Sequence, residues 1–288
     1  MRKRVGVLMG VTLLALGACG GAKDNEPPVA TPSLTLNHTQ VPIGSPVKLA
    51  YTFQVADNAS FDGDYWVFVH VLDPEGERLW TEDHQPPTPT SQWKPGQKIE
   101  YTRTVFVPNY PYIGEAVVRL GLYRPDTNKR LALNATEASR REYVVARFQV
   151  QPQSENIFLI FKDGWHPAEV AADNPAAEWQ WTRKTSTLSF KNPRKESVFY
   201  LEYDARTDLF PAPQQVTVRL AEHTIGTFAA DSREKKLITF PITAAQLGQG
   251  DMAEIIIDLD KTFTPGNGDT RELGIRVFHA FVDPRDGK

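Results

Sequence analysis

The second half of the chain carries residues suited to binding a sugar. Indole faces stack on the apolar face of a pyranose ring, and the indole N–H can donate a hydrogen bond. An extended strand would place Trp179 and Trp181 on the same side. The opposing interpretation is that these rings fill the core, because aromatic side chains are mostly buried in proteins. The candidate ligand-binding residues are Trp165, Trp179, Trp181, Asp163, His166 and Glu169.

Two histidines of the first half are candidates for acid–base chemistry. His84 follows Asp83 in a proline-rich segment, and an acid beside an imidazole can begin such a site. No Gly-x-Ser-x-Gly motif accompanies the pair, so we expect His84 to be an exposed hydrogen-bonding residue of a loop. His70 lies in an apolar strand, where a lone histidine is typical of a hydrogen-bonded core position. We therefore assign no catalytic residue and predict that the protein is not an enzyme.

The sequence offers little for a metal ion. Cys19 is the single cysteine, which excludes an internal disulfide and a cysteine metal site. No His-Glu-x-x-His motif is present. Acidic loops at 57–64 and 266–269 contain oxygen ligands, but neither follows the spaced twelve-residue calcium loop. We predict no metal site and no bound cofactor.

Short apolar stretches separated by turns of Pro, Gly, Asn and Asp make up most of the chain. Residues 47–55 alternate apolar and polar side chains, the period of a strand with one buried face. Residues 65–72 are apolar on both faces and predict a central, covered strand. Residues 82–96 contain four prolines and cannot enter a sheet interior, while 243–247 allow one helical turn at most. This pattern predicts an all-β fold of two tandem antiparallel β-sandwich domains.

Length and composition suggest the domain boundaries. A chain of 288 residues corresponds to two domains at about 150 residues each. We place the first sandwich at 34–150 and the second at 157–288, joined by a linker at 151–156. Residues 19–33 are polar and contain prolines, with nothing to bury, so we expect a disordered tether there.

The first predicted sandwich contains a series of turn and core motifs. In chain order they are Phe68–Asp73, Gly76, Asp83–Pro86, Trp93–Gly96 and Gly121–Tyr123. This order is similar to that of an immunoglobulin-like β-sandwich module, over about residues 45–133. Such modules occur on bacterial membrane proteins, including envelope glycosyltransferases that use lipid-linked sugars. Because the motifs are turns and core positions, the resemblance implies a fold and no chemistry.

The second predicted sandwich has motifs of its own. It opens with Gly164-Trp165-His166-Pro167, continues with Glu178–Trp181 and ends with Arg271–Ile275. These motifs resemble the jelly-roll-like module of bacterial glycosyltransferases and carbohydrate-binding proteins, over most of residues 157–282. The resemblance implies a jelly-roll-like fold. It carries over no catalytic role, because no membrane-spanning catalytic domain accompanies the module here.

The N-terminus has the pattern of an export signal. A basic cluster at residues 2–4 precedes an apolar run that is too short to span a bilayer permanently. The run ends in Leu16-Gly17-Ala18-Cys19, which resembles the lipobox of bacterial lipoproteins. The resemblance implies that residues 1–18 are a signal peptide and that Cys19 carries diacylglyceryl and palmitate-type acyl chains, anchoring the protein to an inner or outer membrane of the bacterial cell envelope. The alternative is a free thiol at the end of an uncleaved signal anchor.

The charge balance argues against a nucleic-acid partner. The formal net charge is −3, and it becomes −6 when residues 1–18 and their three positive charges are removed. A mildly acidic protein has no electrostatic attraction to nucleic acid or to anionic lipid. Attachment to a membrane must then depend on the lipid anchor.

Together these features predict a membrane-anchored envelope lipoprotein that acts without catalysis as a binding or assembly module. Its expected partner is an envelope polysaccharide or the glycan-export machinery. Two alternatives stay open. One is a structural accessory subunit of an integral membrane protein complex, which predicts a broad apolar patch. The other is a carbohydrate-active enzyme, which predicts two facing carboxylates, at least one with a raised pKa.

Overall fold

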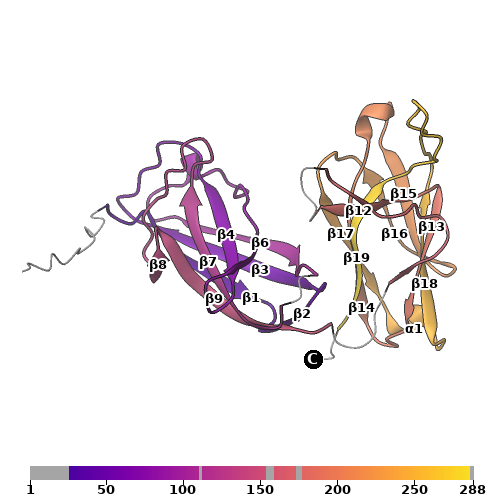
Figure 1. Cartoon of the computed structure of the whole chain (residues 1–288), viewed down its shortest axis with the longest axis horizontal. Helices are drawn as coiled ribbons and strands as arrows, with labels where there is room; N and C mark the ends of the chain where they lie inside the picture. The colour runs from indigo at the N-terminus through magenta and orange to yellow at the C-terminus, as the bar shows by residue number, and fades with distance from the viewer. Residues whose placement is uncertain (1–25, 110–111, 154–158, 173–176, 286–288) are drawn as a thin grey trace, which may run out of the picture.

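The computed structural model describes residues 26–109, 112–153, 159–172 and 177–285 (Figure 1). The predicted signal peptide, Cys19 and residues 20–25 of the predicted tether lie outside these residues. The described chain consists mainly of strands, arranged in four sheets. It contains no helix that is long and apolar enough to cross a membrane.

Two sheets form the first sandwich. Its strands are β1 Ala30–Leu36, β2 Gln40–Pro42, β3 Pro46–Val55, β4 Trp66–Leu72, β5 Arg78–Thr81, β6 Lys98–Phe106, β7 Gly114–Tyr123, β8 Glu137–Ser139 and β9 Glu142–Gln151. One sheet has the order β1-β3-β6, and the other has the order β2-β9-β7-β4-β5 with β8 paired to β9. The pairings are antiparallel, except that β2 runs parallel to β9.

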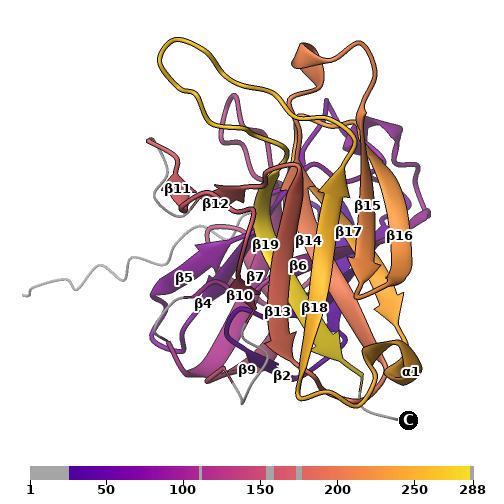
Figure 2. The same ribbon diagram turned by 90° about the vertical axis from the view of Figure 1, so that its right-hand side faces the viewer.

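Two further sheets form the second sandwich. Its strands are β10 Ile160–Phe161, β11 Glu169–Val170, β12 Glu178–Trp181, β13 Thr185–Lys191, β14 Ser197–Asp204, β15 Gln214–Leu220, β16 His223–Ala230, β17 Lys236–Ile242, β18 Met252–Leu259 and β19 Arg276–Pro284. The sheet orders are β10-β13-β18-β15-β16 and β11-β12-β19-β14-β17. Figure 2 shows the first of these two sheets in front of the second.

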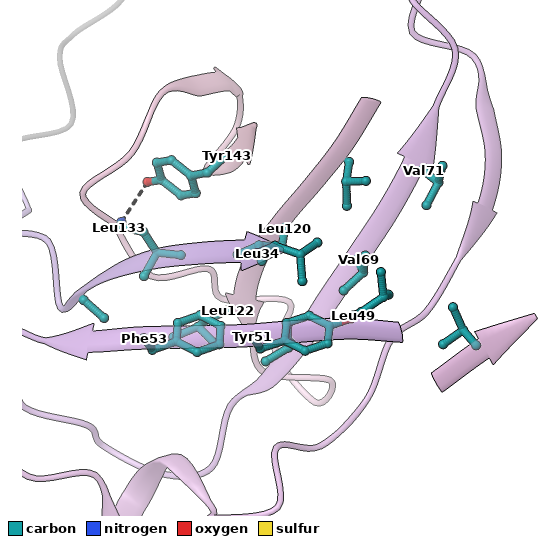
Figure 3. Packing of buried hydrophobic residues seen from close by; sticks show 14 of the residues in the cluster. Leu34, Leu49, Tyr51, Phe53, Val69, Val71, Leu120, Leu122, Leu133 and Tyr143 are labelled. Atoms are coloured by element: carbon teal, nitrogen blue, oxygen red, sulfur yellow. Dashed lines mark hydrogen bonds between the residues drawn. The ribbon is translucent and has the colours of Figure 1, made fainter. Parts of the chain in front are cut away.

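Alternation along the strands builds a separate core between each pair of sheets. In β3 the inward residues Leu49, Tyr51 and Phe53 are at most 4 % exposed, as the sequence pattern predicts. They share one hydrophobic cluster with Leu120 and Leu122 of β7 (Figure 3). The second cluster is formed by other strands and includes Leu188, Phe190, Phe199, Leu201 and Ile255. Two cores, each between two mainly antiparallel sheets, confirm the predicted all-β sandwich fold.

Within the described residues, helical structure is confined to single turns. The helix α1 spans Ala244–Leu247, as predicted, and two 3-10 turns occupy Thr90–Gln92 and Thr207–Leu209. The backbone N–H of Gln246 donates to the hydroxyl of Thr243, and the side-chain oxygen of Gln246 accepts from the Thr243 N–H. This reciprocal pair is a capping box, which satisfies two donors at the helix start.

The predicted tether extends too far along the chain. Residues 30–33, placed in the tether by their prolines, form the first part of β1 and pair with β3. Ala30 and Pro32 are buried while Thr31 and Ser33 are exposed, so this segment has an apolar face that the composition conceals. Pro32 is tolerated because β1 is an edge strand. The linker predicted between the two sandwiches, at 151–156, lies outside the described residues from residue 154 onward. The domain boundaries therefore stay a prediction.

Candidate ligand-binding face

Two of the predicted tryptophans share one surface of the second sandwich. Because β12 is extended, Trp179 and Trp181 project from the same side. Arg276 of β19 is the cross-strand neighbour of Trp181. Its guanidinium carbon lies 4.9 Å from the ring centroid of Trp179 and 5.7 Å from that of Trp181. Val277, the next residue, is 3 % exposed and belongs to the core, so Arg276 and both indoles lie on the outer side of the sheet.

Asp204 fixes the position of Arg276. The Asp204 side chain is 5 % exposed, and its two carboxylate oxygens accept hydrogen bonds from two guanidinium nitrogens of Arg276, with 2.8 Å between Nε and Oδ1. Bidentate charged pairs of this kind are among the strongest polar contacts in proteins. The cation also gains attraction from the indole faces beside it. Arg276 is therefore held in one position against the two tryptophans.

Phe278 and Lys235 extend the same surface. The ring centroid of Phe278 lies 5.5 Å from the guanidinium carbon of Arg276 and 6.1 Å from the Trp179 ring centroid. The Lys235 ammonium nitrogen lies 4.2 Å from the centroid of the Phe278 ring. We call this surface the aromatic face, and its residues are Trp179, Trp181, Arg276, Phe278, Asp204 and Lys235.

The two indoles differ in how far a ligand can reach them. Trp181 is 8 % exposed, and its ring packs edge-on against Phe263. Trp179 is half-buried, and its Nε1 atom is covered. The accessible part of Trp179 is therefore ring carbon, which suits an apolar stacking contact.

Trp165 lies apart from the aromatic face. Its indole N–H donates to the carbonyl oxygen of Thr187 at 2.9 Å. Its ring contacts Phe161, with 4.7 Å between the centroids, and packs against the core cluster. Trp165 therefore fits the alternative interpretation of the sequence, in which an indole closes the core.

The three predicted polar residues are also dispersed. His166 is 5 % exposed, and its Nε2 lies 2.7 Å from the backbone oxygen of Glu272. Asp163 is exposed. Glu169 is the cross-strand neighbour of Trp179 and forms an ion pair with Arg271 at 2.5 Å. Of the six predicted residues, Trp179, Trp181 and Glu169 are thus brought together.

Sequence reasoning missed Arg276, Phe278 and Asp204. The register between β12 and β19 joins residues about a hundred positions apart, and no local pattern reports it. The available signal is the alternation within β19, where Arg276 and Phe278 flank the buried Val277. That pattern places both side chains on one outer surface, but it does not reveal the tryptophans beside them.

The acidic loops hold no cluster of metal ligands. Asp62 accepts hydrogen bonds from Tyr65 and Lys129, and Asp269 pairs with Arg271. Among the described residues, no three His, Cys, Asp or Glu side chains are grouped so that they could hold a metal ion.

The aromatic face adjoins the first sandwich. The ring of His279 stacks on Phe106 of β6, with 4.5 Å between centroids and 5° between planes. Tyr200 approaches the same Phe106 ring to 6.3 Å. His279 Nδ1 lies 2.7 Å from a carboxylate oxygen of Glu202. In Figure 1 the sheet that contains β12, β19, β14 and β17 lies on the side of the second sandwich nearer to the first.

Glu82, which is half-buried, and His84, which is buried, are two titratable groups of the first sandwich near this junction. Burial raises the pKa of Glu82 to about 7, while the nearby Arg103 opposes the rise and Glu202 of the second sandwich adds to it. The prediction that His84 is exposed is wrong, because it is 4 % exposed. Its ring nitrogens lie 2.8 Å from the backbone oxygen of Glu82 and 2.9 Å from the hydroxyl of Tyr101. Burial lowers its pKa to about 4.

Replacing Glu82 with glutamine should stabilise the protein above neutral pH. Between its ordinary pKa of 4.5 and its folded pKa of about 7, the native state binds more protons than the unfolded chain, so this group lowers stability as pH rises. The variant should exceed the parent in free energy of unfolding by about 3 kcal/mol at pH 8 and equal it at pH 4. Urea unfolding at a series of pH values measures the difference.

His84 provides an internal check on this prediction. Its folded pKa of about 4 lies below its ordinary 6.5, so it adds stability as pH rises through that interval and opposes Glu82. In Glu82→Gln the stability should therefore rise between pH 4 and 6.5. Glu100→Gln is the matched control, since the Glu100 side chain on β6 is 59 % exposed, and it should keep the parent profile. A Glu82→Gln profile parallel to that of the parent would contradict the assignment.

Comparisons with known proteins give no family. No protein-family model matches the chain, and no curated protein matches it. A solved carbohydrate-binding module of the β-sandwich superfamily is 12 % identical, with 89 % of this chain and 99 % of that chain covered and a TM-score of 0.26. The CBM51-2 and INT domains of Clostridium perfringens ZmpB are 7 % identical, with 60 % and 37 % covered and a TM-score of 0.27. Bacteroides uniformis β-glucuronidase is 9 % identical, with 89 % and 30 % covered and a TM-score of 0.33.

These similarities are weak. The chain spans about a third of the length of the first solved structures that it matches. TM-scores of 0.26 to 0.33 leave the relationship at the level of general likeness. The assignment of the β-sandwich fold rests on the sheets and cores of the chain itself.

Proposed function

We propose that the protein is a lipid-anchored envelope protein that binds a glycan, without catalysis, through its aromatic face. The observation that carries this proposal is the arrangement of Trp179 beside Arg276 and Phe278 on an outer sheet surface. A pyranose presents carbon–hydrogen faces and hydroxyl groups together. The half-buried indole of Trp179 can stack on the carbon–hydrogen face, and the guanidinium of Arg276 can donate hydrogen bonds to the hydroxyl groups.

The rigidity of the site supports the proposal. Arg276 uses Nε and one terminal nitrogen on Asp204. Among the described residues no hydrogen-bond partner of the other terminal nitrogen is found, and we propose that its N–H donors bind sugar hydroxyls. Because Asp204 and the indoles already hold Arg276, little conformational freedom would be lost on binding. Glu169 adds a carboxylate on the strand next to Trp179.

The accessory-subunit alternative has less support. It predicts a broad apolar patch, whereas the exposed large apolar residues found among the described residues are distributed over both sandwiches: Trp66, Ile113, Ile160, Phe161, Val170, Leu209 and Met252. Scattered apolar residues of this kind are ordinary on protein surfaces.

One observation favours the enzyme alternative. Glycosidases use two carboxyl groups, and the one that acts as acid has a raised pKa. The pKa of Glu82 is raised by burial, and the charge of Glu202 on the other sandwich raises it further. The Glu202 carboxylate, however, is hydrogen-bonded to Nδ1 of His279. Two cavities, of about 180 and 340 Å³, lie beside Glu26 and Pro28, and neither is lined by Glu82 or Glu202. Prolonged incubation with polysaccharide should therefore release no reducing ends, and their release would overturn the non-catalytic assignment.

Alanine at Trp179 should weaken glycan binding at least tenfold, which corresponds to about 1.4 kcal/mol, because the stacking surface is lost. The measurement is calorimetric titration of residues 20–288, without the lipid, against hexasaccharides of glucose and N-acetylglucosamine and against oligogalacturonate. The fragment starts at Gly20 because β1 already begins at Ala30.

Trp165→Phe is the matched control for this titration. The ring of Trp165 closes the core, so its replacement should lower the melting temperature and leave affinity unchanged. Unchanged affinity in Trp179→Ala, or a melting shift as large as that of Trp165→Phe, would show that Trp179 is a structural residue. Absence of binding by the parent protein to every saccharide would count against the proposed function itself.

A further inference from the structure

Trp66 is the most exposed tryptophan of the chain, and it lies on the first sandwich. It is 37 % exposed, whereas the other five tryptophans are buried or half-buried. Its neighbour in β4, Val67, is fully buried in the core, so Trp66 projects from the outer side of the sheet. The cross-strand partner of Trp66 on β7 is Tyr123, which places the two side chains on the same face of the sheet.

Asp83 adds a carboxylate beside Tyr123. One of its oxygens accepts from the backbone N–H of Val69 at 3.2 Å. Burial raises the pKa of the Tyr123 hydroxyl, and the charge of Asp83 and a hydrogen bond to it raise this pKa further. Asp83 is exposed, and a carboxylate can accept about four hydrogen bonds. Its oxygens therefore keep capacity for donors from outside the protein.

The Phe68 ring is buried and tightly packed beneath this surface. It is 2 % exposed although it lies on the outer side of β4, because the guanidinium of Arg130 lies 4.4 Å from its ring centroid and Tyr123 lies 5.9 Å from it. Gly121, opposite Phe68, leaves the space that this ring fills, since an added Cβ would lie 2.4 Å from ring atoms. The sequence prediction of a strand covered on both sides holds for Phe68 and fails for Trp66.

A set of charged side chains lies next to Phe68. A carboxylate oxygen of Glu142 lies 3.4 Å from Nδ1 of His70 and 3.1 Å from a guanidinium nitrogen of Arg130. The other carboxylate oxygen lies 3.8 Å from a guanidinium nitrogen of Arg119. His70 is thus a half-buried residue of the outer surface, not the core histidine that the sequence predicts. The single negative charge of Glu142 compensates one of the two arginine charges and leaves about one positive charge beside Phe68. No ion pair of Asp83 is found among the described residues.

We propose that Trp66, Tyr123 and Asp83 form a second saccharide platform, on the first sandwich, for an uncharged sugar unit. The indole supplies a stacking surface for the C–H face of the ring, and Asp83 accepts hydrogen bonds from sugar hydroxyls. An acidic sugar would place its carboxylate near that of Asp83 and be repelled. The platform rests on the proposed glycan-binding function, but it uses other residues on another sandwich, so the two can be tested separately.

The experiment follows the six indole N–H signals of ¹⁵N-labelled residues 20–288 by NMR. The probes are cellohexaose, maltohexaose and chitohexaose, with trigalacturonate as the charged control. Trp66→Phe and Trp179→Phe assign the two signals of interest. For at least one neutral probe, the Trp66 signal should shift saturably, and trigalacturonate should leave it in place.

Variants then test the roles of the side chains. Trp66→Ala should abolish binding at the platform while leaving the melting temperature nearly unchanged, and Asp83→Asn should weaken it at least fivefold. Leu209→Ala, which removes a side chain that is 44 % exposed on the second sandwich, is the matched control and should change nothing.

Each outcome separates this inference from the proposed function. A shift of the Trp179 signal alone would overturn the platform and keep the aromatic face as the glycan site. A shift of Trp66 alone would support the platform and count against the aromatic face. Equal shifts with trigalacturonate would overturn the preference for uncharged sugars, and no shift with any probe would overturn both proposals.

Discussion

Alanine at Gly164 is expected to destabilise the second sandwich by about 4 kcal/mol or more, at the upper end of single substitutions. An added Cβ would lie 1.9 Å from the carbonyl oxygen of Thr185 and 2.8 Å from the Cα of Ser186. The carbonyl oxygen of Gly164 accepts hydrogen bonds from the Arg183 N–H at 2.7 Å and from the Ser186 hydroxyl at 2.6 Å. The two segments therefore cannot separate to admit a methyl group without losing these bonds.

Gly266→Ala separates this clash from backbone strain. Gly164 and Gly266 have φ values of +82° and +79°, but nothing lies within 4 Å of a Cβ built at Gly266. Left-handed strain alone costs about 1–2 kcal/mol, and this is the loss expected at Gly266. Urea unfolding of both variants gives the comparison. Equal losses at the two positions would mean that close packing at Gly164 contributes nothing.

The position of Gly164 also gives a physical reason for the Gly-Trp motif. The same approach of backbone segments that excludes a Cβ brings the indole N–H of Trp165 to the carbonyl of Thr187. The motif therefore holds the start of the second sandwich against β13. These contacts give Trp165, a candidate ligand contact by residue type, a structural role.

Local periodicity was sufficient to predict which side chains are inward along single strands. The alternation around Tyr51 and that of Val216, Val218 and Leu220 both correspond to buried faces. The single turn α1 was also predictable, since its length is bounded by the neighbouring strands. These properties depend on residues a few positions apart, and the period of two reports them directly.

Contacts between distant strands could not be predicted in this way. Arg276 reaches Trp179 and Trp181 through the register of two strands far apart in the chain, and Asp204 joins them from a third strand. His84 shows the same limit, because its burial depends on Tyr101 of another strand. The prediction that both faces of residues 65–72 are covered is wrong for Trp66, which is 37 % exposed. An apolar run does not show that the side chains of other strands fail to cover its first residues.

We propose that a lipid anchor on Cys19 determines where the protein is located, and Cys19→Ala should abolish that anchoring. Several acyl chains hold a protein stably to a bilayer, whereas one chain holds it only weakly. Without the cysteine, the protein should accumulate as an unprocessed precursor or appear in the soluble fraction after cell fractionation. Globomycin, which blocks lipoprotein signal cleavage, should likewise leave the precursor uncut, and Gly20→Ala should be processed normally.

The short distance along the chain from Cys19 to the first sandwich sharpens this prediction. Glu26 already pairs with Arg141 of the sandwich at 2.5 Å, and the seven residue steps between Cys19 and Glu26 span at most about 25 Å. A protein anchored at Cys19 therefore keeps that end of the first sandwich close to the lipid surface. A lysine introduced near Glu26 should then be shielded from soluble amine reagents on intact membranes and become reactive in Cys19→Ala. Unchanged membrane retention of the processed Cys19→Ala protein would overturn the anchor and, with it, this orientation.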